Sequence, residues 1–409
     1  MIAVFIFVIL LIYSLYNKER GLIYTAVLSP ALLSISIYEI GTVFFCLSIV
    51  YLFLFKDQIK SINFGIMSFG HVIIITIFMY IISGVIAQEK HYYALFRSLI
   101  EFSVVPICCW SVFTKKNRFR DFVNILFKAS FLIIGYTFIE TILKDNPYVH
   151  LCIAEDCFGG KFIDGVRFGF RRCQAFFSYH ETLGAYCMTN IGFFVCLLYI
   201  KNLDNSLRTK INLVIGLLCV CVFLTGSRSS ILATVMALFP ILFAKKRYVL
   251  LVPVLFCIVY FFMPYYFSEI LSSMINTDSV NGSNSEMRST QLELSFYYLM
   301  RANNIFLGNG FSFADNNVVG VDSAMAGAES IWFRIIMDQG IMGIICTAYF
   351  FIYSIYRSAK VCRLFIFFPL AYLVARTVAV VPTMTLSYII PYIMFLALLE
   401  RFNVKLKTK

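Results

Sequence analysis

Long apolar runs, separated by short polar connections, make up most of this chain. A helix needs about 20 predominantly apolar residues to cross a bilayer. Runs that approach this length lie near residues 2–16, 21–37, 40–55, 63–87, 94–114, 121–143, 183–200, 211–226, 229–244, 248–267, 333–356, 364–380 and 383–401. The pattern predicts an all-α, polytopic membrane protein with about 12 or 13 transmembrane helices.

The first 55 residues leave one boundary open. Met1 to Tyr16 has neither a positive leading region nor a small-residue cleavage site, so we expect a retained span and not a signal peptide. The stretch 21–55 is interrupted only by Pro30 and Glu39. It predicts either two short spans or one span and an interfacial segment.

Basic residues are concentrated in particular connections between the runs. These are residues 115–120, 201–210, 245–247, 357–363 and 401–409. Each basic connection is separated from the next by an even number of predicted spans, so all of them fall on one side, which the positive-inside rule identifies as the cytoplasm. The two long polar connections then face outward.

The runs and long connections divide the chain into five parts. We expect N-terminal transmembrane helices in 1–143, a first large outer loop in 144–182, central transmembrane helices in 183–267, a second large outer loop in 268–332, and C-terminal transmembrane helices with a basic cytoplasmic tail in 333–409. Within the second loop, helical spacing of apolar residues over 291–300 predicts an interfacial helix, closed by a turn at Gly308 to Gly310.

Composition agrees with this reading. The chain is 60% hydrophobic and only 14% charged, whereas soluble domains carry about a quarter charged residues. The formal net charge of +12 would suggest nucleic-acid binding in a soluble protein. Here the positive charge lies mostly in the short connections between spans, where it indicates how the spans are oriented in the membrane. We therefore expect no nucleic-acid partner.

Three arginines in the first outer loop are candidates for anion binding. Arg167, Arg171 and Arg172 lie within six positions. Guanidinium groups keep their charge and present a planar fork of donors that matches phosphate oxygens. The alternative is contact with lipid headgroups or pairing with Asp156 and Asp164.

Arg228 lies in Gly226-Ser-Arg-Ser-Ser230, the minimal outer turn of a helical hairpin. Such a turn leaves almost no loop to solvate the charge, so an anion site is the first interpretation. Snorkelling of the side chain to headgroups is the alternative. Arg288, just before the predicted interfacial helix, is a further candidate on the same face.

Two positions could supply acid–base chemistry. Glu329 stands at the predicted water–membrane boundary, where partial desolvation would raise the pKa of its carboxyl group and suit it to act as a general base. The alternative is a structural role, because a carboxylate is also favoured at a helix N-terminus. His180, followed by Glu181, ends the first loop and is the second candidate. Arg97 and Glu101, four apart inside an apolar run, predict an intrahelical ion pair.

The cysteines indicate neither a metal nor a cofactor. Most of the 13 lie in apolar runs, and no Cys/His spacing resembles a zinc site. Cys152, Cys157 and Cys173 share the first outer loop, where a disulfide between two of them is expected without the pair being deducible.

The order of these features resembles the bacterial O-antigen polymerase and O-antigen ligase superfamily. Three segments carry the resemblance: Arg172-Cys-Gln-Ala-Phe-Phe-Ser-Tyr-His-Glu-Thr-Leu-Gly184 before a span, the Gly226–Ser230 hairpin turn, and Arg288 with Leu307-Gly-Asn-Gly-Phe311 and the stretch 329–343. They cover roughly the C-terminal 60% of the chain.

The resemblance implies a metal-independent, inverting glycosyltransferase of GT-C-like architecture in the bacterial inner membrane, with its active site facing the periplasm. Its substrates would be undecaprenyl-pyrophosphate-linked oligosaccharide and polysaccharide, with membrane lipid around it and a chain-length regulator as a further partner. Arg228, Arg172, Arg171, Arg288 and Arg167 would hold the pyrophosphate. Glu329 or His180 would take the proton from the acceptor.

Departures from the family pattern favour the polymerase branch. Ligases carry a His where the large loop re-enters the membrane, and this sequence has Glu329 and Ser330 there. His180 and Glu181 replace the Pro-Asn pair of the first segment. The alternatives are an O-antigen ligase acting on lipid A core and a lipid-linked oligosaccharide flippase, which should bury ionisable residues near the midplane of several spans.

Overall fold

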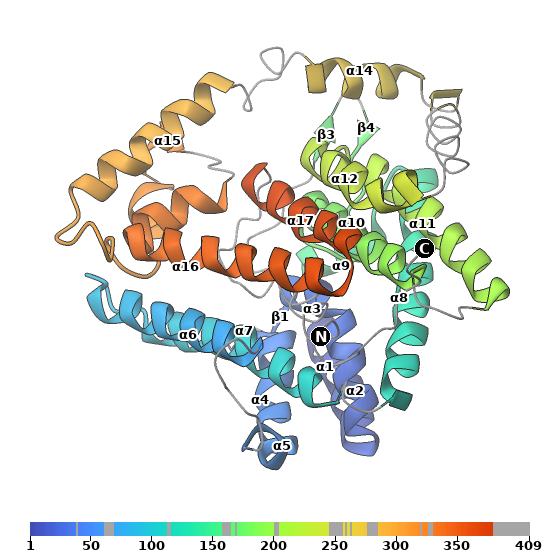
Figure 1. The fold of residues 1–409 in the computed structure, drawn as a ribbon, viewed down its shortest axis with the longest axis horizontal. Helices are drawn as coiled ribbons and strands as arrows, with labels where there is room; N and C mark the ends of the chain where they lie inside the picture. Colours follow the sequence, from blue (N-terminus) through green and yellow to red (C-terminus); the bar gives the residue numbers. More distant parts are fainter. Residues whose placement is uncertain are drawn as a thin grey trace.

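The computed structural model describes the chain except residues 38–39, 61–68, 113–115, 158–164, 168–169, 200–203, 245–256, 258–259, 262–263, 276–284, 320, 326–329 and 379–409. The predicted spans 248–267 and 383–401 thus lie largely or wholly outside it. Within the described part the protein is helical, apart from two short β-hairpins, as the apolar runs predict (Figure 1).

Four of the described helices are long and apolar enough to cross a bilayer: Tyr92–Val112, Arg118–Leu143, Asn205–Leu224 and Ile331–Val361. Shorter apolar helices accompany them at Ile2–Tyr16, Val43–Leu54, Gly70–Ile86, Arg228–Leu242 and Arg363–Ala375. The prediction of an all-α, polytopic membrane protein is confirmed.

The N-terminal part contains eight helices and a small hairpin. In chain order these are α1 (Ile2–Tyr16), α2 (Lys18–Val27), α3 (Ser29–Ser34), β1 (Ser36–Ile37), β2 (Gly41–Thr42), α4 (Val43–Leu54), α5 (Lys56–Lys60), α6 (Phe69–Ile86), α7 (Tyr92–Val112) and α8 (Lys116–Leu143). The run 21–37 forms two short helices, α2 and α3, divided at the Leu28–Pro30 junction, where Pro30 opens α3.

The central part continues from α8 into the first long loop. It holds α9 (Pro147–Ala154), the strands β3 (Val166–Arg167) and β4 (Phe170–Arg171), and then α10 (His180–Leu197), α11 (Asn205–Leu224), α12 (Arg228–Ala244) and α14 (Pro264–Ile275). Gly192 of α10 lies directly against the ring of Phe368, where an added Cβ would come within 2.1 Å of the ring.

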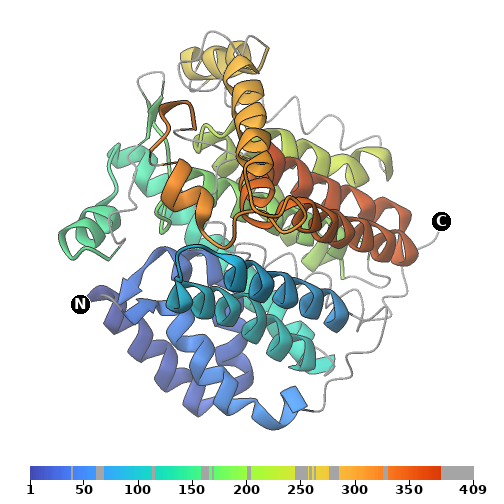
Figure 2. The same ribbon diagram turned by 90° about the vertical axis from the view of Figure 1, so that its left-hand side faces the viewer.

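The C-terminal part begins with the predicted outer helix. It holds α15 (Ser285–Met300), the π-helical turn η4 (Ala314–Val318), the 3₁₀ turn η5 (Ser323–Met325), α16 (Ile331–Val361), the 3₁₀ turn η6 (Arg363–Ile366) and α17 (Phe367–Val378). Figure 2 shows α15–α17, orange to red, above the blue N-terminal helices, and α16 packs against α6. The helix predicted at 291–300 is confirmed and begins six residues earlier.

Contacts between connections agree with the alternating orientation of the predicted spans. At one end, the Met1 amino group lies 2.8 Å from Glu155 of the first long loop, and Asn316 of the second long loop lies 2.8 Å from His91 between α6 and α7. At the other end, Arg20 lies 3.2 Å from Asp121 at the start of α8. We call the end that carries both long loops the outer face.

Helix α16 is broken. Gly340 has φ 61° and ψ −153°, outside the helical region, so the helix divides into a first limb before Gly340 and a second limb after it. A break within a bilayer leaves unpaired backbone groups that must find partners inside the protein. The break at Gly340 was not predicted from the sequence.

The loop around Gly308 fills the break. The N–H groups of Asn309 and Gly310 donate to the carbonyls of Met337 and Asp338 at 2.9 Å each. In return, the N–H of Met342 donates to the carbonyl of Phe306 at 3.0 Å. The turn predicted at Gly308 to Gly310 therefore does more than close α15, because it completes the hydrogen bonding of a distant helix.

Candidate functional site

The first long loop is attached to the outer turn of the α11–α12 hairpin. The N–H of Cys173 donates to the carbonyl of Leu224 at 3.1 Å. Arg172 Nε donates to the carbonyl of Thr225 at 2.8 Å, and its Nη2 lies 3.3 Å from the carbonyl of Gly226. Arg172 is thereby fixed two residues from Arg228, the first residue of α12.

The serines around Arg228 build the turn. Ser227 precedes α12, and its hydroxyl accepts from the N–H of Ser230 at 3.4 Å, as an N-cap does. Gly184 of α10 lies against Ser230, because an added Cβ would come within 2.5 Å of the Ser230 hydroxyl. The Arg172–Gly184 segment and the Gly226–Ser230 turn, distant in sequence, thus form one region on the outer face.

Glu181 joins two of the predicted site residues. Its Oε1 lies 3.3 Å from Arg172 Nη2 and is also paired with His180 Nε2. His180 is only 4% exposed. Glu181 follows His180 directly in the sequence, but its link to Arg172 depends on the fold of the loop.

Arg171 has a different environment. Its Nη1 donates to Asp145 at 2.8 Å, and its Nε lies 4.0 Å from the buried carboxylate of Glu140. The hydrogen bond from His150, assisted by the charge of Arg171, lowers the pKa of Asp145. Two carboxylates therefore compensate Arg171, which ties the loop to the outer end of α8.

Two further candidates lie in elements other than the Arg228 turn, and a third lies outside the described part of the chain. Arg167 lies in β3, and its backbone pairs with Phe170. Arg288 is half-buried in α15, whose main neighbours are α16 and η5. Glu329 lies outside the described residues.

A second polar centre lies where the second long loop meets α16. Arg334 Nη2 lies 3.1 Å from Asp315 of η4. Asp338, 4% exposed, accepts a hydrogen bond from the N–H of Ala314 at 2.7 Å. Arg334 and Asp338 are four residues apart, a spacing that could have drawn attention to them in the sequence, as it did for Arg97 and Glu101.

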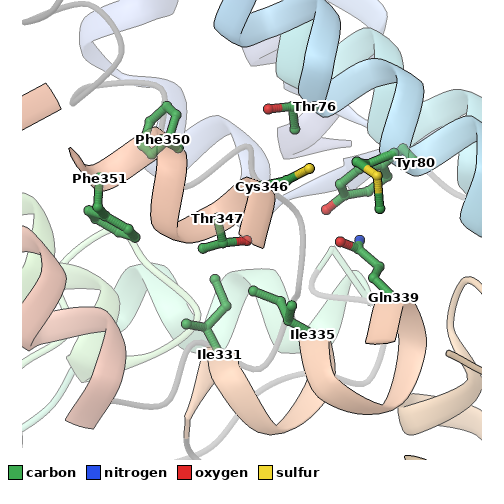
Figure 3. A pocket seen from close by; sticks show the side chains of 10 residues that line it. Thr76, Tyr80, Ile331, Ile335, Gln339, Cys346, Thr347, Phe350 and Phe351 are labelled. Carbon is green, nitrogen blue, oxygen red and sulfur yellow. The ribbon is translucent and has the colours of Figure 1, made fainter. Parts of the chain in front are cut away.

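A largely apolar pocket lies between α6 and the two limbs of α16 (Figure 3). It has about 550 Å³ of empty space, part of which is open to the surroundings. Ile331, Ile335 and Gln339 come from the first limb, and the second limb contributes Phe350 and Phe351. The break at Gly340 separates these two walls.

Residues 213–348 match the O-antigen ligase family. This region is therefore similar to proteins of the O-antigen ligase family. The matched region includes the Arg228 turn, the second long loop and the broken part of α16, so the resemblance carried by those segments is confirmed. It supports an enzymatic role connected with O-antigen, and it does not separate polymerase from ligase. None of the curated proteins compared with the chain matches it.

Gly165 gives a way to test the Arg172–Glu181–His180 group without removing a charge. An added Cβ would lie 2.9 Å from the His180 ring and 3.2 Å from Arg172 Cδ. We expect Gly165→Ala to displace these side chains and to lower O-antigen assembly by roughly tenfold or more, since small misplacements in a site cost up to about 100-fold. The measurement is transfer by purified protein.

Gly216→Ala is the matched control, because an added Cβ there meets nothing within 4 Å. Equal activity of the two variants would show that this group has no part in the reaction. Equal yields of monodisperse protein would exclude misfolding as the cause of a loss.

Proposed function

We propose that the chain is an O-antigen polymerase. It would transfer the growing glycan from undecaprenyl pyrophosphate to the non-reducing sugar of a new lipid-linked repeat unit. The observation that carries the proposal is the attachment of Arg172 to the Thr225 and Gly226 carbonyls, beside Arg228. Within a region related to O-antigen enzymes, it places two guanidinium-bearing segments together at the outer face.

In the proposed reaction, the acceptor hydroxyl oxygen attacks the anomeric carbon of the donor. The bond from that carbon to the pyrophosphate oxygen breaks, and undecaprenyl pyrophosphate leaves with the electron pair. Arg228 would stabilise the charge that develops on the leaving group. Arg172 would support Arg228 by fixing the turn, and Arg288 would approach from the second loop.

Glu329 is our proposed base for the acceptor proton. His180 is the other candidate from the sequence, but its burial and its pairing with Glu181 favour a positioning role. Loss of a general base typically costs about 10²–10⁴-fold. We therefore expect Glu329→Gln to lose activity on that scale. His180→Gln should lose less and should leave the pH profile of the reaction unchanged.

The pocket beside α16 is suited to a hydrocarbon chain. Most of its walls are apolar side chains of helices that lie among the membrane-spanning segments. We propose that one polyprenyl tail occupies it while the pyrophosphate lies at the outer face. We propose that the chain lies in the bacterial inner membrane and that the reaction takes place on the periplasmic side.

The distribution of buried charge favours an enzyme over a flippase. Glu140 lies in the last turn of α8, next to the first long loop, and Asp338 lies next to the second. Arg97 and Glu101 form the predicted intrahelical pair, 3.9 Å apart, within three turns of the start of α7. A transporter should instead place such groups along a path through the membrane.

Reconstitution tests the proposal. Purified protein in liposomes, given a lipid-linked repeat unit alone, should form lipid-linked polymers of increasing length. A ligase would leave this substrate unchanged and would act only after lipid A core is added. A flippase would move the substrate across the bilayer without lengthening it. Either of those two results would overturn the polymerase assignment.

A further inference from the structure

The first outer loop contains two cysteines that the fold brings together and one that it holds apart. Cys152 lies in the last turns of α9, and the N–H of Cys157 donates to the carbonyl of Cys152 at 2.8 Å. This backbone hydrogen bond makes the two residues neighbours at the end of α9. Both residues are buried, at 0% and 3% exposure. The sequence alone left the pairing open.

Cys173 faces α8 instead. Its Sγ lies 3.2 Å from the hydroxyl of Thr141 and 3.9 Å from the carbonyl of Thr137. Both threonines belong to α8, whereas Cys152 and Cys157 flank the end of α9. A disulfide from Cys173 would require the loop to leave its attachment to α8.

The turn between Cys152 and Cys157 is a contact point for the N-terminal helices. The carbonyl of Cys157 accepts from the N–H of Ser36 at 2.6 Å. Glu155 accepts from the Met1 amino group at 2.8 Å. A disulfide across this turn would stabilise the attachment of the first outer loop, which carries Arg171 and Arg172, to the N-terminal helices.

We propose that Cys152 and Cys157 form a disulfide in the mature protein and that Cys173 remains a thiol. The inference rests on the outward orientation contained in the proposed function, because disulfides form and persist in oxidising compartments. In the structure all three are free thiols, so the proposal concerns an oxidation of this pair.

The oxidant would be a protein disulfide of the periplasm. A thiolate from one cysteine attacks that disulfide and forms a mixed disulfide, and the second thiolate then displaces the oxidant. Two S–H bonds break and one S–S bond forms between the cysteines. The S–S bond of the oxidant breaks, and the oxidant takes up the two protons and two electrons and leaves as a dithiol. Burial raises the pKa of the Cys152 thiol to about 12, so the exchange belongs to the stage before α9 is packed.

Mass spectrometry of the full-length protein tests the pairing. Cells are quenched with an alkylating agent, and the protein is denatured without reductant and cleaved after Glu155. We expect the fragments that carry Cys152 and Cys157 to stay joined until reductant is added, and Cys173 to be alkylated throughout. Recovery of Cys152 and Cys157 as separate alkylated fragments, or a link from Cys173 to either, would overturn the proposal.

Two variants and a labelling control sharpen the result. Cys173→Ser should keep the joined fragments, and Cys152→Ser should make Cys157 fully alkylated without reductant. Glu89→Cys, in the exposed connection between α6 and α7, should react with an impermeant maleimide in spheroplasts. Absence of that labelling would overturn the orientation and with it the disulfide. A linked pair in protein that forms no polymer would uphold the disulfide while overturning the polymerase assignment.

Discussion

Replacing Arg228 by alanine should leave cells with lipopolysaccharide that carries a single repeat unit. Arg228 begins α12 at a turn that is held by Arg172 and capped by Ser227. Its removal takes away the charge that would stabilise the pyrophosphate as it leaves. Loss of one such stabilising contact costs about 10²–10³-fold in kcat, or about 2.7–4 kcal/mol. The measurement is the ladder of chain lengths on a lipopolysaccharide gel.

Arg301→Ala is the matched control for this experiment. Arg301 is an exposed arginine at the end of α15, and its guanidinium lies 4.1 Å from the centre of the Tyr297 ring. The same loss of charge on the same face should leave the ladder intact. Arg228→Lys should be intermediate, because lysine keeps the charge and loses the planar fork of donors. Normal long chains in Arg228→Ala would remove Arg228 from the site.

Arg172 makes a less direct test of pyrophosphate binding. Its guanidinium donates to the Thr225 carbonyl and pairs with Glu181, so its removal also releases the first loop from the hairpin. The structure therefore divides the predicted arginines by environment. Arg172 contacts the turn and Glu181, and Arg171 contacts the carboxylates of Glu140 and Asp145. Arg228 is the residue that we propose for the pyrophosphate.

The sequence predicts the helices well because lipid imposes a simple rule on composition. In a bilayer every backbone polar group must be paired within the protein, so a long apolar run predicts a helix. The runs 94–114 and 121–143 correspond to α7 and α8 within a few residues. If 21–37 and 40–55 are counted as two spans, six predicted spans separate the N-terminus from residue 155 and place both on one side, which agrees with the contact between them.

The division of the loop arginines depends on contacts that local sequence does not encode. Glu140 lies inside a run that reads as an ordinary span, and only the folded loop places it near Arg171. The interpretation of Asp156 and Asp164 as partners had the right chemistry, but the carboxylates that the structure shows beside Arg171 are Glu140 and Asp145. The break in α16 was missed for the same reason, since its hydrogen-bond partners lie about thirty residues earlier.

Gly340→Ala should destabilise the protein more than any other glycine-to-alanine change in the described part of α16. Gly340 has φ 61°, a conformation that residues with a side chain rarely adopt. An added Cβ would also come within 2.4 Å of the Ile305 carbonyl oxygen and 2.6 Å of the Gly308 nitrogen. Strain and collision together should cost about 3–5 kcal/mol. The measurement is thermal unfolding in detergent, where we expect Tm to fall by on the order of 5 °C.

Two further variants separate the broken helix from a general effect of losing a glycine. Gly308→Ala should reproduce the loss, because Gly308 has φ 74° and an added Cβ would come within 2.6 Å of the Gly340 nitrogen. Gly135→Ala in α8 meets nothing within 4 Å and should change stability by less than about 1 kcal/mol. Wild-type stability in Gly340→Ala would mean that α16 runs through residue 340 without a break. The loop at Gly308 would then lose its hydrogen bonds to the carbonyls of Met337 and Asp338. The two walls of the apolar pocket would no longer face each other.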